Sequence, residues 1–223
     1  HLSEVTKNFK TTFTEGLMKR RDLESYLATA EQSAGIIFAN LHRASELIKS
    51  FKQVAVDQSS DDRRTFNARD YIDEIVLSLG PRLKKTAHRL TVTCDPELVL
   101  DSYPGAYSQI LTNLIMNSLI HAYDEDSAGL ISIDLQADKD GVMLRYADDG
   151  KGMDAEQAAK VFEPFFTTKR GAGGSGLGMH ILYNLVTRKL NGAVFCKSAP
   201  GQGTTFTIAA PLPRGEQDDR TAA

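Results

Sequence analysis

An apolar segment that carries an evenly spaced row of polar side chains constrains this chain most. Pro104 is well placed to open a helix that runs to about Tyr123, because proline suits the first helical turn. Most of its circumference is apolar, through Ile110, Leu111, Leu114, Ile115, Met116, Leu119 and Ile120. Asn113, Asn117 and His121 are four residues apart and so share one helix face. The fold must bury this helix and still give its amides partners, because an unpaired buried polar group costs about 1–3 kcal/mol.

Two glycine clusters follow this segment. The first is Asp148-Asp149-Gly150-Lys151-Gly152-Met153. Its glycines allow close backbone approach to a ligand, and a carboxylate at a strand end accepts a hydrogen bond from an exocyclic amine such as that of adenine. The second, Gly171-Ala172-Gly173-Gly174-Ser175-Gly176-Leu177-Gly178, opens a helix whose free N–H groups and dipole favour an anion. No Lys-Ser/Thr pair follows these glycines, so the cluster is not a P-loop.

The asparagines have two possible roles. An asparagine oxygen is a hard neutral ligand that suits Mg²⁺, which keeps several waters and also binds substrate phosphates. The alternative is that these amides bond to neighbouring backbone groups. For the first glycine cluster, the alternative is a simple surface turn. Together, the polar stripe and the two glycine clusters predict a nucleotide phosphate site.

A phenylalanine-rich segment separates the two clusters. Phe162-Glu163-Pro164-Phe165-Phe166-Thr167-Thr168-Lys169 has the composition of an active-site lid, anchored by three buried phenylalanines and mobile at its glycine-rich end. Lys169 and Arg170 either reach phosphates or remain solvated charges.

The first part of the chain has a different pattern. Apolar residues alternate steps of three and four, which is the heptad pattern of bundles, at Leu27, Ala30, Ala34, Ile37, Leu41, Ala44, Ile48, Phe51 and Ala55. A shorter stripe, Leu2 to Phe13, precedes it, and Gly16 with Lys19-Arg20-Arg21 marks a turn. Such a hairpin buries its stripes by forming a dimeric four-helix bundle, or by packing on the following domain in a monomer.

The remaining residues mix helices and strands. A polar linker, 58–64, precedes helices at 68–85 and 176–190. The expected strands are 90–94, a hairpin of 131–135 and 142–146, and a closing pair at 194–197 and 204–209. This order indicates an α+β two-layer sandwich, with a disordered tail at 214–223.

Composition excludes several function classes. The 223 residues carry a net charge of −3, with pI near 6.0, so no basic surface for nucleic acid or anionic membrane is expected. Cys94 and Cys196 are isolated, which favours buried thiols in a reducing compartment. No signal peptide is visible, and because the chain starts at His1 without Met and its first residues look helical, we interpret it as a fragment. We expect it in the cytoplasm, with any membrane anchor in missing upstream segments.

The motifs resemble those of the ATP-binding catalytic domain of sensor histidine kinases. Residues 113–117 resemble the family's N box, 148–152 its G1 box, 162–166 its F box and 174–178 its G2 box, while 201–206 match the closing G-x-G-T-x-F motif. The resemblance covers about 66–213 and implies a Bergerat fold with a mixed sheet. Residues 1–58 resemble part of the dimerisation and phosphotransfer domain, truncated at its N-terminus.

The resemblance also implies roles for particular residues. Asp148 would bind the adenine amine, Asn117 would hold Mg²⁺, and Asn113 would act beside it at the phosphates. The implied ATP or ADP contacts are otherwise His121, Tyr123, Gly150, Gly152, Lys169, Gly174, Ser175, Gly176, Leu177, Gly178 and Thr205. The implied reaction transfers the γ-phosphate to a histidine and then to an aspartate of a response regulator receiver domain, in a homodimer.

One departure from the family pattern concerns the acceptor histidine. Neither His1 nor His42 stands in a motif like His-Glu-x-x-Asn-x-Pro, so we expect the acceptor upstream. Ile120, where many relatives have lysine, removes one phosphate contact. Two alternatives are an ATP-binding signalling module of this fold without kinase chemistry and an anti-sigma-type serine kinase; the long heptad hairpin argues against the second.

Overall fold

The computed structural model describes residues 2–56, 62–124, 127–139, 141–168 and 176–212, except for the side chains of 42–56. The chain forms two compact units, His1–Lys52 and Gln53–Ala223. The predicted tail, 214–223, lies outside the described residues.

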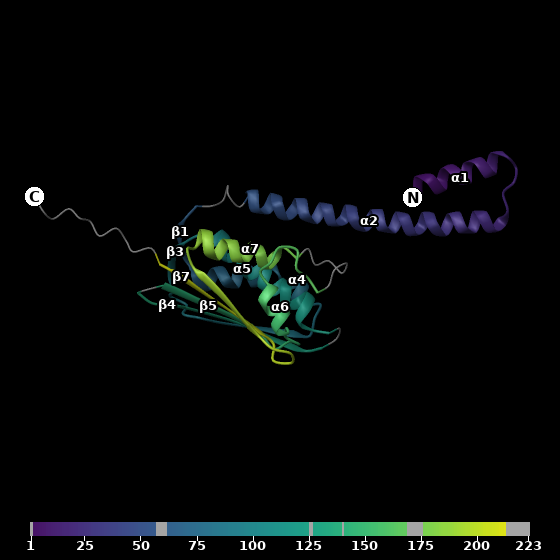
Figure 1. Ribbon diagram of the computed structural model, residues 1–223. Coiled ribbons are helices and arrows are strands. Elements are labelled where there is room, and N and C mark those ends of the chain that lie inside the picture. Colours follow the sequence, from purple (N-terminus) through teal and green to yellow (C-terminus); the bar gives the residue numbers. More distant parts are fainter. Residues whose placement is uncertain (1, 57–61, 125–126, 140, 169–175, 213–223) are drawn as a thin grey trace, which may run out of the picture. The chain divides into compact units, whose positions relative to one another are not determined.

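The first unit is a helical hairpin (Figure 1). Helix α1 (Leu2–Thr14) and helix α2 (Arg20–Val56) are joined by a turn in which Gly16 has a φ of 69°. The Phe9 and Tyr26 rings stack at 4.1 Å between centroids, and the Tyr26 hydroxyl lies 3.4 Å from Thr6 Oγ1. None of the described side chains of this hairpin is buried.

The second unit contains a five-stranded sheet in the order β2-β4-β5-β7-β6. The strands are β2 (His88–Cys94), β4 (Gly129–Ala137), β5 (Gly141–Asp148), β6 (Ala193–Ser198) and β7 (Thr204–Pro211). Strands β2 and β4 are parallel and the other neighbours antiparallel, so the sheet is mixed. The predicted strands all form.

A two-stranded ribbon was not expected from the sequence. Strand β1 (Arg64–Asn67) pairs antiparallel with β3 (Val99–Ser102). The prediction that Arg64 belongs to a linker is therefore wrong. Four-residue strands contain too few alternations for the side-chain pattern to distinguish them from a loop.

The helices of this unit are α3 (Ala68–Ser78), α4 (Gly80–Leu83), α5 (Pro104–Asn117), α6 (Ala155–Lys160) and α7 (Gly178–Asn184). Two π-helical turns, η1 (Ser118–Ala122) and η2 (Leu185–Lys189), continue α5 and α7. The helix predicted for 68–85 is divided at Leu79, next to Gly80 and Pro81, since proline has no N–H to continue the bonding. Helix α6 was not predicted; a capping box of Asp154 and Gln157 begins it.

The core lies between the helices and one face of the sheet. Figure 1 shows α5 and α7 on the same side of the strands. Along β7, Thr204, Phe206, Ile208 and Ala210 are buried, while the residues between them are partly exposed on the other face. Helix α5 contributes Ile110, Leu111, Leu114 and Ile115, all fully buried. The predicted two-layer architecture with a mixed sheet is confirmed.

None of the described helices combines sufficient length with sufficient apolar character to cross a bilayer.

Candidate functional site

A buried carboxylate stands where β5 ends. Asp148 pairs in register with Thr204 at the start of β7 and is only 7% exposed. Its Oδ2 accepts a hydrogen bond from Ser118 Oγ at 2.8 Å, and its Oδ1 accepts one from the Gly150 N–H at 3.1 Å. Burial raises the pKa of Asp148, while the donated hydrogen bonds oppose that rise. The group is thus surrounded by donors, although it lies in a poorly solvated place.

Two neighbouring cavities open beside α5. The first, here named the Asp148 cavity, has a volume of about 150 Å³ and is lined by residues including Asp148, Lys151, Gly152, Gln157 and Thr204. The second, the Asn113 cavity, has a volume of about 170 Å³, and Asn113, Gly176 and Gly178 are among its walls. The side chains that line both are Asn117, His121, Phe166, Thr167 and Met179. The cavities are therefore adjacent lobes of one cleft.

The two asparagines of α5 differ in their hydrogen bonds. Asn113 Nδ2 donates to the Gly178 carbonyl at 2.9 Å, and its Oδ1 accepts from Gln109 Nε2 at 3.0 Å. Asn113 thereby ties α5 to the first residue of α7. The Asn117 side chain makes no hydrogen bond to a described residue and stands where the two cavities meet.

Asn117 therefore offers a carbonyl oxygen to a ligand. No group of three His, Cys, Asp or Glu side chains that could hold a metal occurs among the described residues. A site with one protein oxygen fits Mg²⁺, which is commonly held by one or two protein ligands together with waters and substrate phosphates. The residues present are consistent with that ion.

His121 lies next to the C-terminal end of the phenylalanine-rich segment. Its Nδ1 lies 3.3 Å from Thr168 Oγ1, and it lines both cavities. It belongs to the π-helical turn η1, yet it remains on the same side as Asn117.

Tyr123 lies away from both cavities. Its hydroxyl is 3.0 Å from Asp149 Oδ1 and 3.2 Å from the Leu130 carbonyl, and its ring packs on His88. Burial, followed by the bond to Asp149, raises the pKa of this hydroxyl. Tyr123 thus anchors the loop after β5, rather than facing the cleft as expected.

The loop glycines serve close packing of the backbone. A Cβ at Gly150 would collide with the Ala122 carbonyl, which accepts a hydrogen bond from the Lys151 N–H at 2.8 Å. Gly152 has a φ of 67°, and a Cβ there would collide with the Ala199 carbonyl. Gly152 also lines the Asp148 cavity, whereas Gly150 lines neither cavity.

The phenylalanine-rich segment is held at both of its described ends. Phe162 packs edge-on against Phe206 at 6.1 Å, and Phe166 lines the cleft. The Phe165 N–H donates to the Gly176 carbonyl at 2.8 Å, which ties the segment to the residues just before α7. The prediction that all three phenylalanines are buried is wrong, because Phe165 is 52% exposed, with a φ of 66°, and Phe162 and Phe166 are only half-buried. Lys169, Arg170, Gly174 and Ser175 lie outside the described residues.

Two other expected contacts do not line the cleft. Leu177 is buried at the cap position of α7. Thr205 points to the other face of the sheet, and its neighbour Thr204 lines the Asp148 cavity. A strand alternates its faces at every residue, so Thr204 faces the cavity and Thr205 faces away from it.

Several residues in or beside the cleft were not singled out from the sequence. Ser118, which bonds to Asp148, had a signal, because it follows Asn117 directly and is polar within an apolar run. Gln157, Val161 and Met179 line the cleft but are common residue types at ordinary positions, so no sequence pattern distinguished them.

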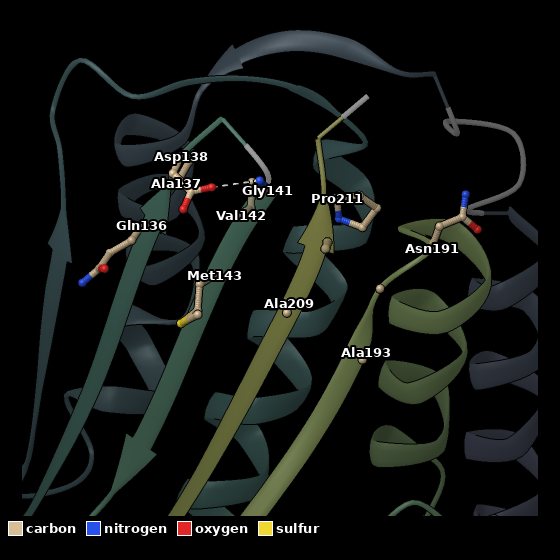
Figure 2. A pocket seen from close by; sticks show the side chains of 12 residues that line it. Gln136, Ala137, Asp138, Gly141, Val142, Met143, Asn191, Ala193, Ala209 and Pro211 are labelled. Carbon is tan, nitrogen blue, oxygen red and sulfur yellow. Dashed lines mark hydrogen bonds between the residues drawn. The ribbon is translucent and has the colours of Figure 1, made fainter. Parts of the chain in front are cut away.

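A larger hollow lies at the opposite end of the sheet (Figure 2). It has a volume of about 600 Å³ and is bounded by the end of β4, the starts of β5 and β6, and the end of β7. Its Asp138 carboxylate accepts a hydrogen bond from the Gly141 N–H at 3.1 Å and so closes the hairpin turn. None of the expected site residues that the structure describes lines this hollow.

Comparisons with known proteins agree with this geometry. Residues 103–214 match the model of the family described as histidine kinase-, DNA gyrase B- and HSP90-like ATPase. The sensor histidine kinase ZraS of Klebsiella oxytoca is 39% identical over 132 residues, which is 58% of this chain and 27% of the relative. The sensor histidine kinase RcsC of Escherichia coli is 27% identical over 171 residues, 74% of this chain and 18% of the relative. The chain thus spans about a quarter or less of these relatives.

Solved structures show the same fold. The catalytic domain of the histidine kinase ThkA aligns with a TM-score of 0.59 and 25% identity, covering 68% of this chain and 96% of that domain. The histidine kinase AdeS of Acinetobacter baumannii aligns over 96% of both chains, with a TM-score of 0.61. At 16% identity, the second likeness concerns the fold alone.

Proposed function

The chain belongs to the family of histidine kinase-, DNA gyrase B- and HSP90-like ATPases, and we propose that it is the catalytic core of a two-component sensor histidine kinase. Membership of this family implies ATP binding. The observation that carries the proposal is that Asp148 and Asn117 open on one cleft, the first as a buried acceptor and the second as an unpaired amide. The relatives reported above are named sensor histidine kinases.

In the proposed complex, each lobe of the cleft binds one part of the nucleotide. The Asp148 carboxylate accepts a hydrogen bond from the adenine amine, and the apolar walls Met153, Val161 and Met179 contact the base. The phosphates extend toward the Asn113 cavity, where the first residues of α7 and Asn113 meet. Gly176 and Gly178 line this cavity, and at Gly176 a Cβ would collide with the Phe165 backbone.

Asn117, at the junction of the lobes, would hold Mg²⁺ through its side-chain oxygen. That ion neutralises charge on the phosphates during phosphoryl transfer. The contribution of this chain to catalysis is therefore positioning, together with exclusion of water by Phe166 and Thr167. The His121–Thr168 contact would keep the segment against the cleft.

The proposal also covers the parts of the molecule that the cleft does not explain. Residues 1–58 form a dimerisation hairpin, and residues 66–213 form the ATP-binding domain. Two hairpins would join as a four-helix bundle, since each has one exposed apolar stripe and an isolated pair cannot enclose a core. The phosphate acceptor is a histidine outside these residues, followed by an aspartate of a receiver domain. Because ATP is the proposed phosphate donor, we propose that the chain lies in the cytoplasm.

Isothermal titration tests the proposal directly. We expect ATP and ADP to bind with Mg²⁺ present, and to bind more weakly when the ion is chelated. A chain that binds neither nucleotide with Mg²⁺ present contradicts the proposal. Transfer of radiolabelled phosphate from ATP to a supplied helix carrying His-Glu-x-x-Asn-x-Pro separates a kinase from a module that only binds ATP.

A further inference from the structure

Three buried polar groups connect the interior of the sheet with the Asp148 cavity. The Tyr146 hydroxyl donates to Ser118 Oγ at 2.8 Å, and Ser118 Oγ donates to Asp148 Oδ2 at 2.8 Å. Tyr146 is fully buried and Ser118 is 1% exposed, so water cannot replace either partner. Neither Ser118 nor Tyr146 lines the Asp148 cavity or the Asn113 cavity, so both lie behind Asp148.

The direction of these bonds follows from the number of hydrogens. A hydroxyl has a single hydrogen to donate. Because Tyr146 supplies the hydrogen between itself and Ser118, the hydrogen of Ser118 remains for Asp148. The other carboxylate oxygen of Asp148 accepts from the Gly150 N–H. Every described partner of the carboxyl group is therefore a donor, and a protonated carboxyl would meet these donors with a hydrogen of its own.

We propose that Ser118 and Tyr146 are positioning residues that hold Asp148 as a hydrogen-bond acceptor and so make the cleft select a 6-amino purine over a 6-oxo purine. This rests on the proposed function, in which Asp148 contacts the base. A 6-amino group donates to the carboxylate, whereas a 6-oxo group would place two acceptors together. Sites built around a polar group discriminate by leaving that group unpaired with the wrong ligand.

The acidity of Asp148 gives a second observable. The titratable groups around it are Asp149 in the loop, Tyr123 after η1, Tyr146 on β5 and Cys196 on β6. Lys151 and His121 line the same cavity. The Ser118 bond lowers the pKa of Asp148, so its removal raises that pKa. Loss of ATP affinity on acidification should then begin at a higher pH in Ser118→Ala than in the unmodified chain.

The experiment compares two tyrosine–serine pairs by titration with Mg-ATP and with Mg-inosine triphosphate, which carries a 6-oxo group. Ser118→Ala should weaken ATP binding about tenfold, and Tyr146→Phe about threefold. Binding of inosine triphosphate should change little, so the ratio of the affinity for ATP to the affinity for inosine triphosphate falls by the same factors. The matched controls are Ser102→Ala and Tyr107→Phe, because Tyr107 is also buried and bonds to Ser102, away from both cavities.

The outcomes are distinct. A reduced ratio in the Ser118 and Tyr146 variants, with an unchanged ratio in the controls, supports the proposal. An unchanged ratio in Tyr146→Phe and Ser118→Ala overturns it, even where both nucleotides weaken in parallel, because that pattern indicates a structural role alone. If Ser118→Ala does not fold, Tyr146→Phe decides. If the unmodified chain binds no ATP, the proposed function fails first; if it binds ATP with an unchanged ratio in both variants, only this inference fails.

Discussion

The hairpin, His1–Lys52, and the unit Gln53–Ala223 use the same kind of helical pattern with opposite results. Leu114 of α5 is fully buried, whereas Leu41 of α2 is 64% exposed, although both belong to regular apolar stripes. In the second unit the sheet supplied by the same chain covers the stripe. In the hairpin, two helices with one stripe each have no third layer. Periodicity thus shows that a face needs cover, but not which molecule provides it.

The largest expected effect concerns the second unit, in which the sheet covers the apolar stripe of α5. Leu114→Ala should lower the free energy of unfolding by about 2–5 kcal/mol, because it removes transfer energy and leaves a cavity. Leu41→Ala is the matched change in the hairpin and should cost well under about 1 kcal/mol in a monomer. Urea unfolding followed by circular dichroism measures both. Equal losses would show that the hairpin stripe is already covered.

The next effect concerns the buried carboxylate. Asp148→Asn should weaken ATP binding about 10- to 100-fold, because the amide places a donor against either Ser118 or the adenine amine. Titration with ATP measures the loss, and Asp134→Asn on the open sheet face is the control. An unaltered affinity for ATP in Asp148→Asn would show that the base binds elsewhere.

A smaller effect separates the two asparagines of α5. Asn117→Ala should remove most of the Mg²⁺ dependence of nucleotide binding, a change of about tenfold. Asn113→Ala should keep that dependence and instead loosen the start of α7, because Asn113 is bonded to Gly178. Titrations with and without a chelator, together with hydrogen exchange of 178–184, distinguish the two. Retained Mg²⁺ dependence in Asn117→Ala contradicts the assignment.

The smallest effect on the cleft comes from the hairpin. Ile37→Asp places a charge on the exposed stripe and should convert the proposed dimer into a monomer, while the ATP affinity stays within about twofold. Light scattering gives the mass, and Lys7→Asp on α1 outside the stripe is the control. A monomeric parent chain would refute the bundle.

The sequence predicts the architecture of the molecule better than its local detail. The architecture followed from strong patterns, namely the apolar run of α5, the Asp-Gly hairpin and the heptads. Local detail did not follow. Thr204 replaces Thr205 because one residue along a strand changes the face, and Phe165 turns outward at a left-handed position that pattern analysis does not detect. Tyr123 and Gly150, expected as ligand contacts, have packing roles in the loop after β5 in this structure, and residue type alone does not separate binding a nucleotide from holding a loop.

The site was predictable where a polar group interrupts an apolar pattern, as at Asn113 and Asn117. It was not predictable where the partner comes from a distant strand. Tyr146 and Ser118 are 28 positions apart, and only the packing of η1 on β5 brings their hydroxyl groups within 2.8 Å. In the sequence, Ser118 and Tyr146 each look like an ordinary core residue.

The π-helical turn Ser118–Ala122 fixes which way the residues at the end of this helix face. Such a turn is equivalent to one residue added to an α-helix. Removing that residue would restore regular winding and rotate everything beyond it by about 100°. The Ala122 carbonyl would then leave the Lys151 N–H, and the end of the helix would no longer hold the loop after β5. Evolution can therefore exchange side chains along this helix, whereas a change in its length would separate the two halves of the cleft.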